Sequence, residues 1–212
     1  MIVYDAFGNP IPLGPQVARG AHATLYEVQQ KPGQVAKLYN SYRAEYEEKL
    51  RWMIANPPAL SLPAGQMSLR WPQMLLYNNR ARFVGFLMPS VERMVPLEEH
   101  LWRSRERLGV QHLLYPFAWT LATTVDALHV KGYVLGGALH PRNLFLSRPV
   151  NAASLTLLKA DTFQVRVPHL VGHTLYPPSA QTEDRYLAPE LLARPAPEAQ
   201  TAEHDGFALA VL

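Results

Sequence analysis

A lysine stands inside an apolar run of the sequence, Val35-Ala36-Lys37-Leu38. An ammonium group buried in such a run without a partner would be costly, so a carboxylate or a phosphate beside Lys37 is expected. The simpler alternative is a lysine that reaches solvent from an edge strand. Lys37 is therefore the first candidate for binding an anion or for organising a charged site.

The segment after this run supplies carboxylates at Glu45, Glu47 and Glu48 within a helical pattern. Helical spacing puts Glu48 opposite the apolar face, whereas Glu47 is followed on its own flank by apolar residues at the third and seventh positions. We therefore expect Glu47 to form an ion pair with Lys37, with Glu45 as the alternative.

A turn of small residues precedes the lysine, because the stretch from Val17 to Tyr26 reads as a strand, a turn at Gly20 and Ala21, and a second strand. Small residues allow backbone N–H groups to approach a phosphate. Gly20 is the only glycine in this turn, and an ordinary hairpin turn is the alternative interpretation.

Several further segments carry polar residues at fixed spacing in the second half of the chain. They are Leu128-His129 with Gly132-Tyr133-Val134, Leu139-His140-Pro141-Arg142-Asn143 before an apolar strand, Asp161-Thr162-Phe163-Gln164, Ala188-Pro189-Glu190, and His204-Asp205-Gly206-Phe207. In order and spacing they resemble the catalytic loop, the metal-binding strand end, the end of the activation segment and the start of the central helix of protein kinases. The resemblance spans Val17 to Leu212, and it is similar in particular to bacterial Ser/Thr protein kinase-like proteins associated with helix-hairpin-helix modules.

The resemblance implies ATP and Mg²⁺ as cofactors, with Asn143 and Asp161 as the metal ligands and Lys37 on the phosphates. It implies that Met88 is the gatekeeper at the end of a strand, and that Pro89 to Val91 form the adenine hinge. It also implies that Asp205 braces the catalytic loop. The nucleotide-binding residues implied in this way are Val17, Gly20, Ala21, Leu25, Ala36, Lys37, Met88, Ser90, Val91 and Leu144.

The sequence departs from the kinase pattern at Ala138, where an aspartate is expected five residues before Asn143. A methyl group cannot accept a proton from the attacking hydroxyl, and loss of general-base help lowers a rate by about 10²–10⁴-fold. Either Ala138 is a designed substitution that traps nucleotide in an otherwise competent kinase, or the chain is a natural pseudokinase that acts as a nucleotide-sensing interaction scaffold. The retained lysine and metal ligands favour the first interpretation.

A small-molecule phosphotransferase is a further alternative, because Leu139-His140-Pro141-Arg142-Asn143 fits aminoglycoside-kinase-type enzymes equally well. Ala188-Pro189-Glu190 and the helix at Asp205 favour a protein substrate, since by resemblance they accompany a peptide-binding activation segment. We therefore expect phosphoryl transfer to a protein Ser or Thr hydroxyl in a form with Asp at position 138.

The elements that must position these residues follow from periodicity and punctuation. Clustered prolines, as at Pro10 to Pro15, interrupt the chain. The predicted elements are a hairpin over 17–28 and 34–39, a helix over 41–55, a second hairpin over 73–77 and 83–88, a helix over 113–129, and strands at 144–146 and 155–158. Together with the resemblance they predict an α+β, bilobal protein-kinase-like fold. An antiparallel β-sheet N-lobe with one helix would cover residues 1–91, and a mainly helical C-lobe, truncated at the C-terminus, would cover 92–212.

The composition narrows the function class. The chain has 212 residues, of which 48% are hydrophobic and 17% charged, and its formal net charge is +3, so it is neither disordered nor a polybasic arm. The absence of cysteine excludes disulfides and thiolate metal sites. No signal peptide or membrane span is expected, and the cytoplasm is the default location. A protein substrate or partner is expected, without nucleic acid or membrane, and the oligomeric state stays open.

Overall fold

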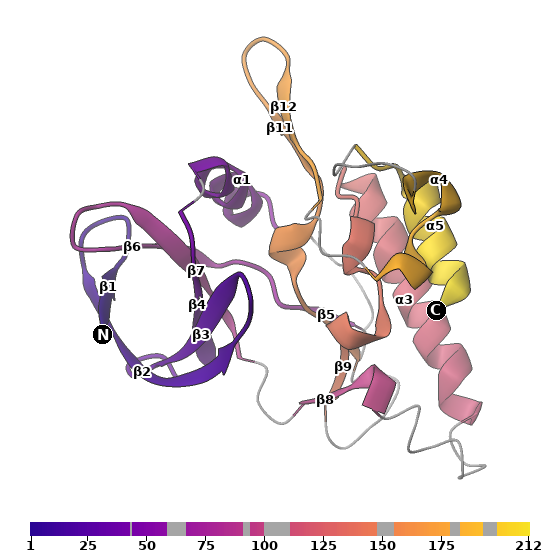
Figure 1. The fold of residues 1–212 in the computed structure, drawn as a ribbon, viewed down its shortest axis with the longest axis horizontal. Coiled ribbons are helices and arrows are strands. Elements are labelled where there is room, and N and C mark those ends of the chain that lie inside the picture. The colour runs from indigo at the N-terminus through magenta and orange to yellow at the C-terminus, as the bar shows by residue number, and fades with distance from the viewer. Residues whose placement is uncertain are drawn as a thin grey trace. The chain divides into compact units, whose positions relative to one another are not determined.

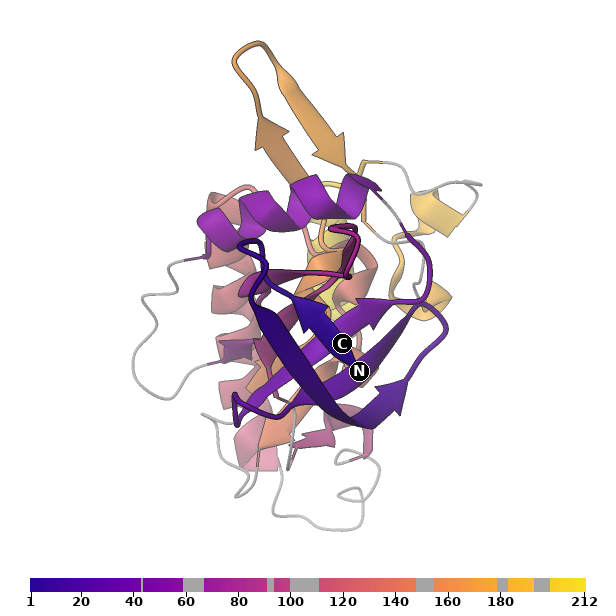
Figure 2. The ribbon, with the colours of Figure 1, turned by 90° about the vertical axis from the view of Figure 1, so that its left-hand side faces the viewer.

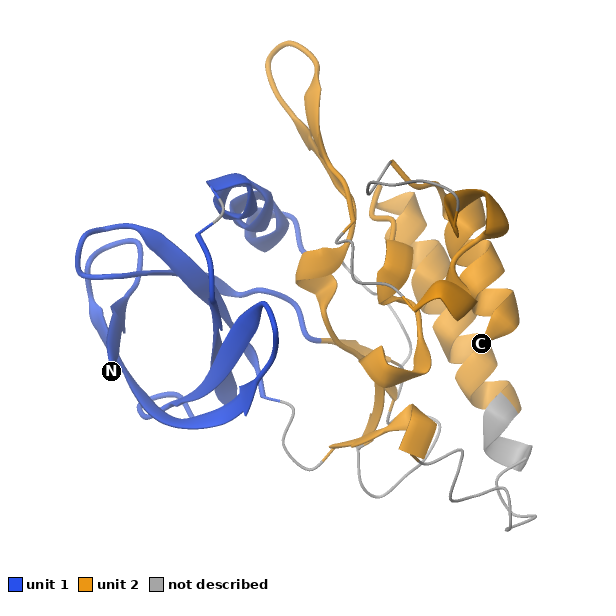
Figure 3. Cartoon of the chain, viewed as in Figure 1, with its two compact units in different colours: residues 1–57, 70–92 blue, residues 58–69, 93–212 orange. Residues whose placement is uncertain are grey.

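The computed structural model describes residues 1–42, 44–58, 67–90, 94–99, 111–147, 155–178, 183–192 and 199–212. The chain divides into two compact units, shown in separate colours in Figure 3. Unit 1 comprises Met1–Pro57 and Arg70–Glu92, and unit 2 comprises Pro58–Leu69 and Arg93–Leu212. The single lobe boundary at residues 91 and 92 stays a prediction; of the described residues before β6, Pro58 and residues 67–69 belong to unit 2.

Unit 1 is built on a closed antiparallel sheet, whose strand order among the described residues is β1-β2-β3-β4-β7-β6. The pairing of Tyr4 with Tyr77 joins β1 to β6 and closes the sheet. Both predicted hairpins are confirmed. The strands are β1 (Ile2–Tyr4), β2 (Pro10–Arg19), β3 (Ala23–Val28), β4 (Gln34–Tyr39), β6 (Met74–Tyr77) and β7 (Phe83–Pro89).

Two parts of this sheet, β1 and the proline-rich start of β2, are not predicted by the sequence pattern. Pro10 and Pro12 pair with Tyr4 and Ile2. Proline is accommodated in a strand where its missing N–H is not needed by the ladder. The prolines that the sequence analysis treats as interruptions therefore lie inside a strand.

The interior of the closed sheet is apolar and includes one residue next to the candidate lysine. Its buried core consists of Val3, Ile11, Leu13, Val28, Ala36, Leu76 and Leu87. Successive side chains of a strand point to opposite faces, so Ala36 faces this core while Lys37 lies on the other face of β4. The strands β4 and β7 approach closely at Gly85, where an added Cβ would lie 1.9 Å from the carbonyl oxygen of Lys37. The close approach of the two strands therefore requires glycine at position 85.

Helix α1 (Ala44–Ala55) lies beside the closed sheet of unit 1 and contacts β6 and β7 (Figure 2). The helix predicted over 41–55 is confirmed, with its start at Ala44. Its buried residues are Lys49, Leu50 and Met53. The indole N–H of Trp71 donates a hydrogen bond to the carbonyl oxygen of Met53 at 3.0 Å, which anchors the last turn.

Unit 2 combines a small sheet with two packed helices. The described strands follow the order β5 (Ser68–Leu69), β10 (Leu155–Leu157), β9 (Leu144–Ser147) and β8 (Met94–Pro96), with β5 parallel to β10. Helix α3 (Gln111–Val130) packs against α5 (Ala202–Val211), and the two lie side by side in Figure 1. The helix predicted over 113–129 and the strands at 144–146 and 155–158 are confirmed.

A hairpin of β11 (Val165–Pro168) and β12 (His173–Tyr176) extends from the rest of unit 2 (Figure 1). Leu170 and Val171 at its tip are fully exposed. Within the described residues, no helix has the length and apolar character needed to cross a membrane.

Candidate functional site

The predicted catalytic loop of unit 2 is held by its own asparagine. Asn143 ends a short 3-10 turn, Pro141–Asn143, and is only 2% exposed. Its side-chain amide donates a hydrogen bond to the carbonyl oxygen of Ala138 at 2.9 Å. The N–H of Leu158 donates to the carbonyl oxygen of Asn143 at 2.9 Å, which ties the loop to the end of β10. The spacing of five residues in the sequence thus corresponds to a direct contact.

The aspartate near the start of helix α5 braces the same loop. The Asp205 carboxylate is buried, and it accepts hydrogen bonds from the backbone N–H groups of Leu135 at 2.7 Å and Gly136 at 2.8 Å. Its Oδ2 also lies 2.8 Å from Nε2 of His129, at the end of α3. Charge-assisted bonds of this kind are stronger than neutral ones. The bracing role predicted for Asp205 is confirmed.

Gly136 takes a conformation that a larger residue could not adopt without strain. Its φ is +56°, and an added Cβ would lie 2.6 Å from the side chain of Pro178. A left-handed backbone at this point allows the N–H groups of the loop to converge on Asp205.

The predicted metal ligand Asp161 lies in a 3-10 turn, Ala160–Thr162, and is buried. The backbone of Gln164 pairs in both directions with Val134, just before the catalytic loop. The side chain of Gln164 bonds to both the N–H and the carbonyl oxygen of Gln200, each at 2.7 Å. The segments around residues 134, 164 and 200 are therefore joined, a contact that the sequence analysis did not find.

The segment that resembles the end of an activation segment, Ala188-Pro189-Glu190, leads into a short helix. Pro189 begins the short helix α4 (Pro189–Leu192), which suits a residue that lacks an N–H. The Glu190 carboxylate lies 3.3 Å from Nε2 of His204 on α5. Arg142 of the catalytic loop pairs with Glu183 at 2.7 Å and with Glu98 at 3.2 Å, so this exposed loop side chain is tied to two other segments of unit 2.

Two buried residues of the loop, Ala138 and His140, bear on whether it can take up a proton. Ala138 is buried and presents a methyl group where a base is expected. His140 is also buried, and its Nδ1 has no hydrogen-bond partner among the described residues. Burial, assisted by the positive charge of Lys159, lowers the pKa of His140 below its ordinary value of 6.5. The imidazole is therefore neutral at pH 7.

In unit 1 the candidate lysine shares a sheet face with several predicted nucleotide-binding residues. Lys37 is paired with Leu25 of β3 and with Phe86 of β7, and Val35 is paired with Met88. Directly paired residues lie on the same face of a sheet. Leu25, Lys37 and Met88 are therefore brought onto one face, together with Val35.

The expectation that Ala36 contacts the adenine is wrong. Ala36 is fully buried in the core of the closed sheet, on the opposite face from Lys37. The residue that shares the Lys37 face is Val35. The strand period of two, applied to the adjacent pair Ala36 and Lys37, could have identified this from the sequence.

The expectation that Glu47 pairs with Lys37, with Glu45 as the alternative, stays a prediction. Oε1 of Glu47 accepts hydrogen bonds from the Arg51 guanidinium at 2.6 Å and from the Tyr77 hydroxyl at 3.1 Å, while Glu45 is exposed. The buried side of the helix carries Lys49. Lys49 lies at helical spacing from Tyr46 and Met53, which is the signal that could have placed it on this side.

The turn at Gly20 and Ala21 is held by a residue that the sequence analysis did not consider. The Asn40 side-chain amide donates to the carbonyl oxygens of Gly20 at 3.1 Å and Ala21 at 3.0 Å. The Asn40 N–H donates to the carbonyl oxygen of His22 at 2.8 Å. Val17, in β2, is exposed. Asn40 therefore fixes the turn through hydrogen bonds to its carbonyl groups.

Three remaining predicted residues have different outcomes. The backbone N–H of Ser90 donates to the carbonyl oxygen of Gly33 at 2.8 Å, so this hinge donor is already used within unit 1. Val91 lies outside the described residues. Leu144 begins β9 and is fully buried in unit 2.

Asn143 and Asp161 offer an amide oxygen and a carboxylate, the hard oxygen ligands that Mg²⁺ prefers. The amide N–H of Asn143 is used by Ala138, which orients the side chain and leaves its oxygen as the ligand atom. The part of the chain that the structure describes has no cluster of three or more His, Cys, Asp or Glu able to hold a metal. The donor set fits an ion that takes one or two protein ligands and completes its shell with phosphate and water.

Comparisons with known proteins agree with this geometry. The chain is 27% identical over 222 residues to Protein kinase YegI of Escherichia coli O157:H7 and 26% identical to that of strain K12, covering 99% of this chain and 32% of each relative. It thus spans about a third of the length of these curated relatives. No protein-family model matches it.

Solved protein kinases share its fold. Vaccinia related kinase 3 superposes with a TM-score of 0.68 at 16% identity, covering 100% of this chain and 66% of that one. The Mycobacterium tuberculosis PknI kinase domain gives 0.59 at 18% identity, covering 94% and 70%. A rhoptry kinase from Toxoplasma gondii gives 0.60 at 15% identity, covering 98% and 62%.

The chain has a protein-kinase-like fold, and its sequence is similar to a curated protein kinase. The α+β fold class and the resemblance to the protein-kinase-like superfamily are thereby confirmed. The association with helix-hairpin-helix modules stays a prediction.

Proposed function

We propose that this chain binds Mg-ATP and that a form with Asp at position 138 phosphorylates Ser or Thr hydroxyls of proteins. The observation that carries the proposal is the catalytic loop, in which Asn143 is bonded to Ala138 and Asp205 holds the preceding backbone. Such a buried, hydrogen-bonded arrangement supports a loop shaped for phosphoryl transfer, which depends mainly on positioning and electrostatics.

The proposed roles use residues of each unit. In unit 1, Lys37 binds phosphate oxygens, and Leu25, Val35 and Met88 give an apolar surface to the base. In unit 2, Asn143 and Asp161 hold Mg²⁺. When bound, Mg²⁺ neutralises charge on the phosphates.

Ala138 makes the chain as it stands a poor catalyst under this proposal. The residues that bind and orient remain, but no group at position 138 takes the proton from the attacking hydroxyl. A pseudokinase that uses nucleotide as a structural ligand is the second candidate, and the buried methyl group of Ala138 is the observation that favours it.

The test begins with thermal shift of the purified chain in an ATP analogue, with and without Mg²⁺. Asp161→Ala should remove the metal-dependent part of the stabilisation, while Asp126→Ala, which changes an exposed aspartate on α3, should leave it unchanged. Autophosphorylation and transfer to protein or aminoglycoside acceptors are then measured for Ala138→Asp. Restored transfer to protein supports the disarmed kinase, and transfer only to the small molecule supports a small-molecule phosphotransferase. Binding without transfer supports the pseudokinase, and an absence of binding contradicts the proposal.

A further inference from the structure

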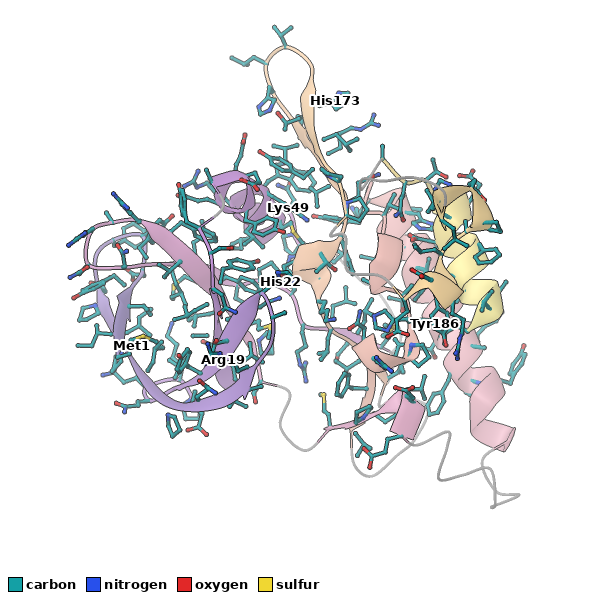
Figure 4. The ribbon with its side chains drawn as sticks, viewed as in Figure 1. Met1, Arg19, His22, Lys49, His173 and Tyr186 are labelled. Atoms are coloured by element: carbon teal, nitrogen blue, oxygen red, sulfur yellow. The ribbon has the colours of Figure 1, made fainter. Side chains whose placement is uncertain are left out.

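The turn between β2 and β3 presents backbone N–H groups to solvent. It consists of Gly20, Ala21 and His22; Figure 4 labels His22 and also Arg19, the last residue of β2. The N–H of Gly20 donates a hydrogen bond to the carbonyl oxygen of Ala23 at 2.9 Å. Ala21 and His22 are exposed, and among the residues that the structure describes none accepts a hydrogen bond from their N–H groups. These two donors are therefore available to a ligand.

The carbonyl groups of the same turn are bonded to Asn40, which directly follows β4. Its side-chain amide donates to the carbonyl oxygens of Gly20 at 3.1 Å and Ala21 at 3.0 Å, and its backbone N–H donates to that of His22 at 2.8 Å. The Asn40 Oδ1 accepts a hydrogen bond from the hydroxyl of Thr24, a buried residue, at 3.2 Å. Because the oxygen and the nitrogen of the amide both have partners, the orientation of the Asn40 side chain is defined.

These bonds determine where the two available N–H groups point. The carbonyl of Gly20 shares a peptide plane with the N–H of Ala21, and the carbonyl of Ala21 shares one with the N–H of His22. In a trans peptide the C=O and the N–H point in opposite directions. Since Asn40 holds both carbonyl groups, the N–H groups of Ala21 and His22 are both directed away from Asn40.

Glycine does not account for the shape of this turn. The φ of Gly20 lies outside the left-handed region. An added Cβ at Gly20 would meet the carbonyl oxygen of Ala23 at 3.5 Å, which is an ordinary van der Waals contact. A residue with a side chain could therefore adopt the same backbone at this point. The bonds made by Asn40 remain as the feature that fixes the turn.

We propose that Asn40 is a positioning residue for nucleotide binding, which directs the N–H groups of Ala21 and His22 toward the polyphosphate. The inference rests on the proposed nucleotide binding, and it adds a residue that the resemblance to kinases does not include. Consecutive N–H groups held on one side of a turn suit an anion. Asn40 lies three positions after Lys37, so one segment carries both the lysine proposed for the phosphates and the residue that orients the turn.

The experiment measures the affinities of Mg-ATP and adenosine for the whole chain and its variants by calorimetry. Asn40→Ala removes both side-chain bonds to the turn, and we expect Mg-ATP to bind roughly 3- to 30-fold more weakly while adenosine binds unchanged. Asn78→Ala is the matched control. Asn78 holds the turn between β6 and β7 by accepting hydrogen bonds from the N–H groups of Arg80 at 2.9 Å and Arg82 at 3.1 Å. This control should leave both affinities unchanged.

Thr24→Val tests the same turn with Asn40 in place. It removes the hydroxyl that orients the Asn40 amide and nearly keeps the shape of the side chain, so Mg-ATP should bind more weakly, by less than in Asn40→Ala. The melting temperature of each variant without nucleotide shows whether it is folded. If Asn40→Ala does not fold, Thr24→Val decides, and an unchanged Mg-ATP affinity in that variant overturns the inference.

Three further results would overturn the inference. The first is an unchanged Mg-ATP affinity in folded Asn40→Ala. The second is an equal loss of affinity for adenosine, which would mean that Asn40 only supports the fold. The third is an equal loss in Asn78→Ala, which would mean that loosening any turn of the closed sheet has the same effect. Failure of the unmodified chain to bind any nucleotide instead contradicts the proposed function itself.

Discussion

The side-chain amide of Asn143 donates a hydrogen bond to the carbonyl oxygen of Ala138 at 2.9 Å, within a loop whose backbone is also held by Asp205. This bond uses the main chain of residue 138 and does not depend on its side chain. The backbone at position 138 is therefore shaped independently of the residue type there. A carboxylate introduced at this point would start from an already ordered main chain.

Ala138→Asp is expected to raise phosphoryl transfer by about 10²–10⁴-fold, because it supplies an acceptor for the hydroxyl proton. The measurement is steady-state transfer of labelled phosphate to a protein acceptor. Ala138→Asn has nearly the same shape without the basic group, and it should remain close to the unmodified chain. Equal rates in the two variants would show that the gain does not come from proton transfer.

Asp205→Ala is expected to destabilise unit 2, because it leaves the buried N–H groups of Leu135 and Gly136 without their acceptor. Each buried unsatisfied group costs about 1–3 kcal/mol. Urea denaturation of the two proteins measures the difference in free energy of unfolding. Glu203→Ala is the control, because it removes an exposed carboxylate in the first turn of α5, and it should change stability little. A loss no larger than that of the control would mean that water replaces the carboxylate at the loop.

Gly85→Ala is expected to cost about 1–3 kcal/mol of stability through overpacking, since its Cβ would meet the backbone of Lys37 and Leu38. The backbone cannot move aside without breaking the pairing of β4 with β7. Gly206→Ala, in α5 where an added Cβ meets no atom within 4 Å, should instead stabilise by roughly 0.5–1 kcal/mol. Chemical denaturation of both variants tests the contrast, and a neutral Gly85→Ala would contradict the close approach.

Stability should fall as the pH drops below about 6.5, partly through His140. Burial lowers the pKa of His140 from its ordinary 6.5, so the unfolded chain binds this proton more tightly than the folded protein does. The His140 contribution is present above pH 6.5 and is lost as the pH falls through the lowered pKa. Melting temperatures between pH 5 and 8 should decline less steeply in His140→Gln than in the unmodified chain. If the melting temperatures of the two proteins decline equally with falling pH, His140 becomes exposed to solvent before it is protonated.

The sequence predicts where the helices and strands of this chain lie better than it predicts which face of each one is buried. The pattern of helix α1 is recognised, yet a shift of one residue turns a helical face by about 100°. Glu47 and Lys49 are two positions apart, which is about 200° around the helix, so the two residues lie on nearly opposite sides of α1. The strand period of two places Ala36 and Lys37 on opposite faces, whereas the resemblance to kinases implies that both residues contact the nucleotide.

Some contacts between residues distant in sequence are implied by a kinase motif, and others are marked by no motif. The bracing by Asp205 is predicted, because the kinase motifs carry a long-range relationship that periodicity does not contain. The bonds of Asn40 to the turn at Gly20 and of Gln164 to Gln200 are not predicted, since no local pattern marks them. Hydrogen bonds of this kind depend on where the fold brings the chain back on itself.

The bond between Asp205 and Leu135 also bears on how the chain acquires its structure during synthesis. The two residues are 70 positions apart, and a ribosome adds roughly 5–20 residues per second, so the acceptor is made roughly 4–14 seconds after the donor. During that interval the nascent loop lacks the group that gives its backbone its final shape. The closed sheet of unit 1 needs no residue beyond Pro89 and can form earlier. The loop braced by Asp205 is therefore completed later than the closed sheet of unit 1.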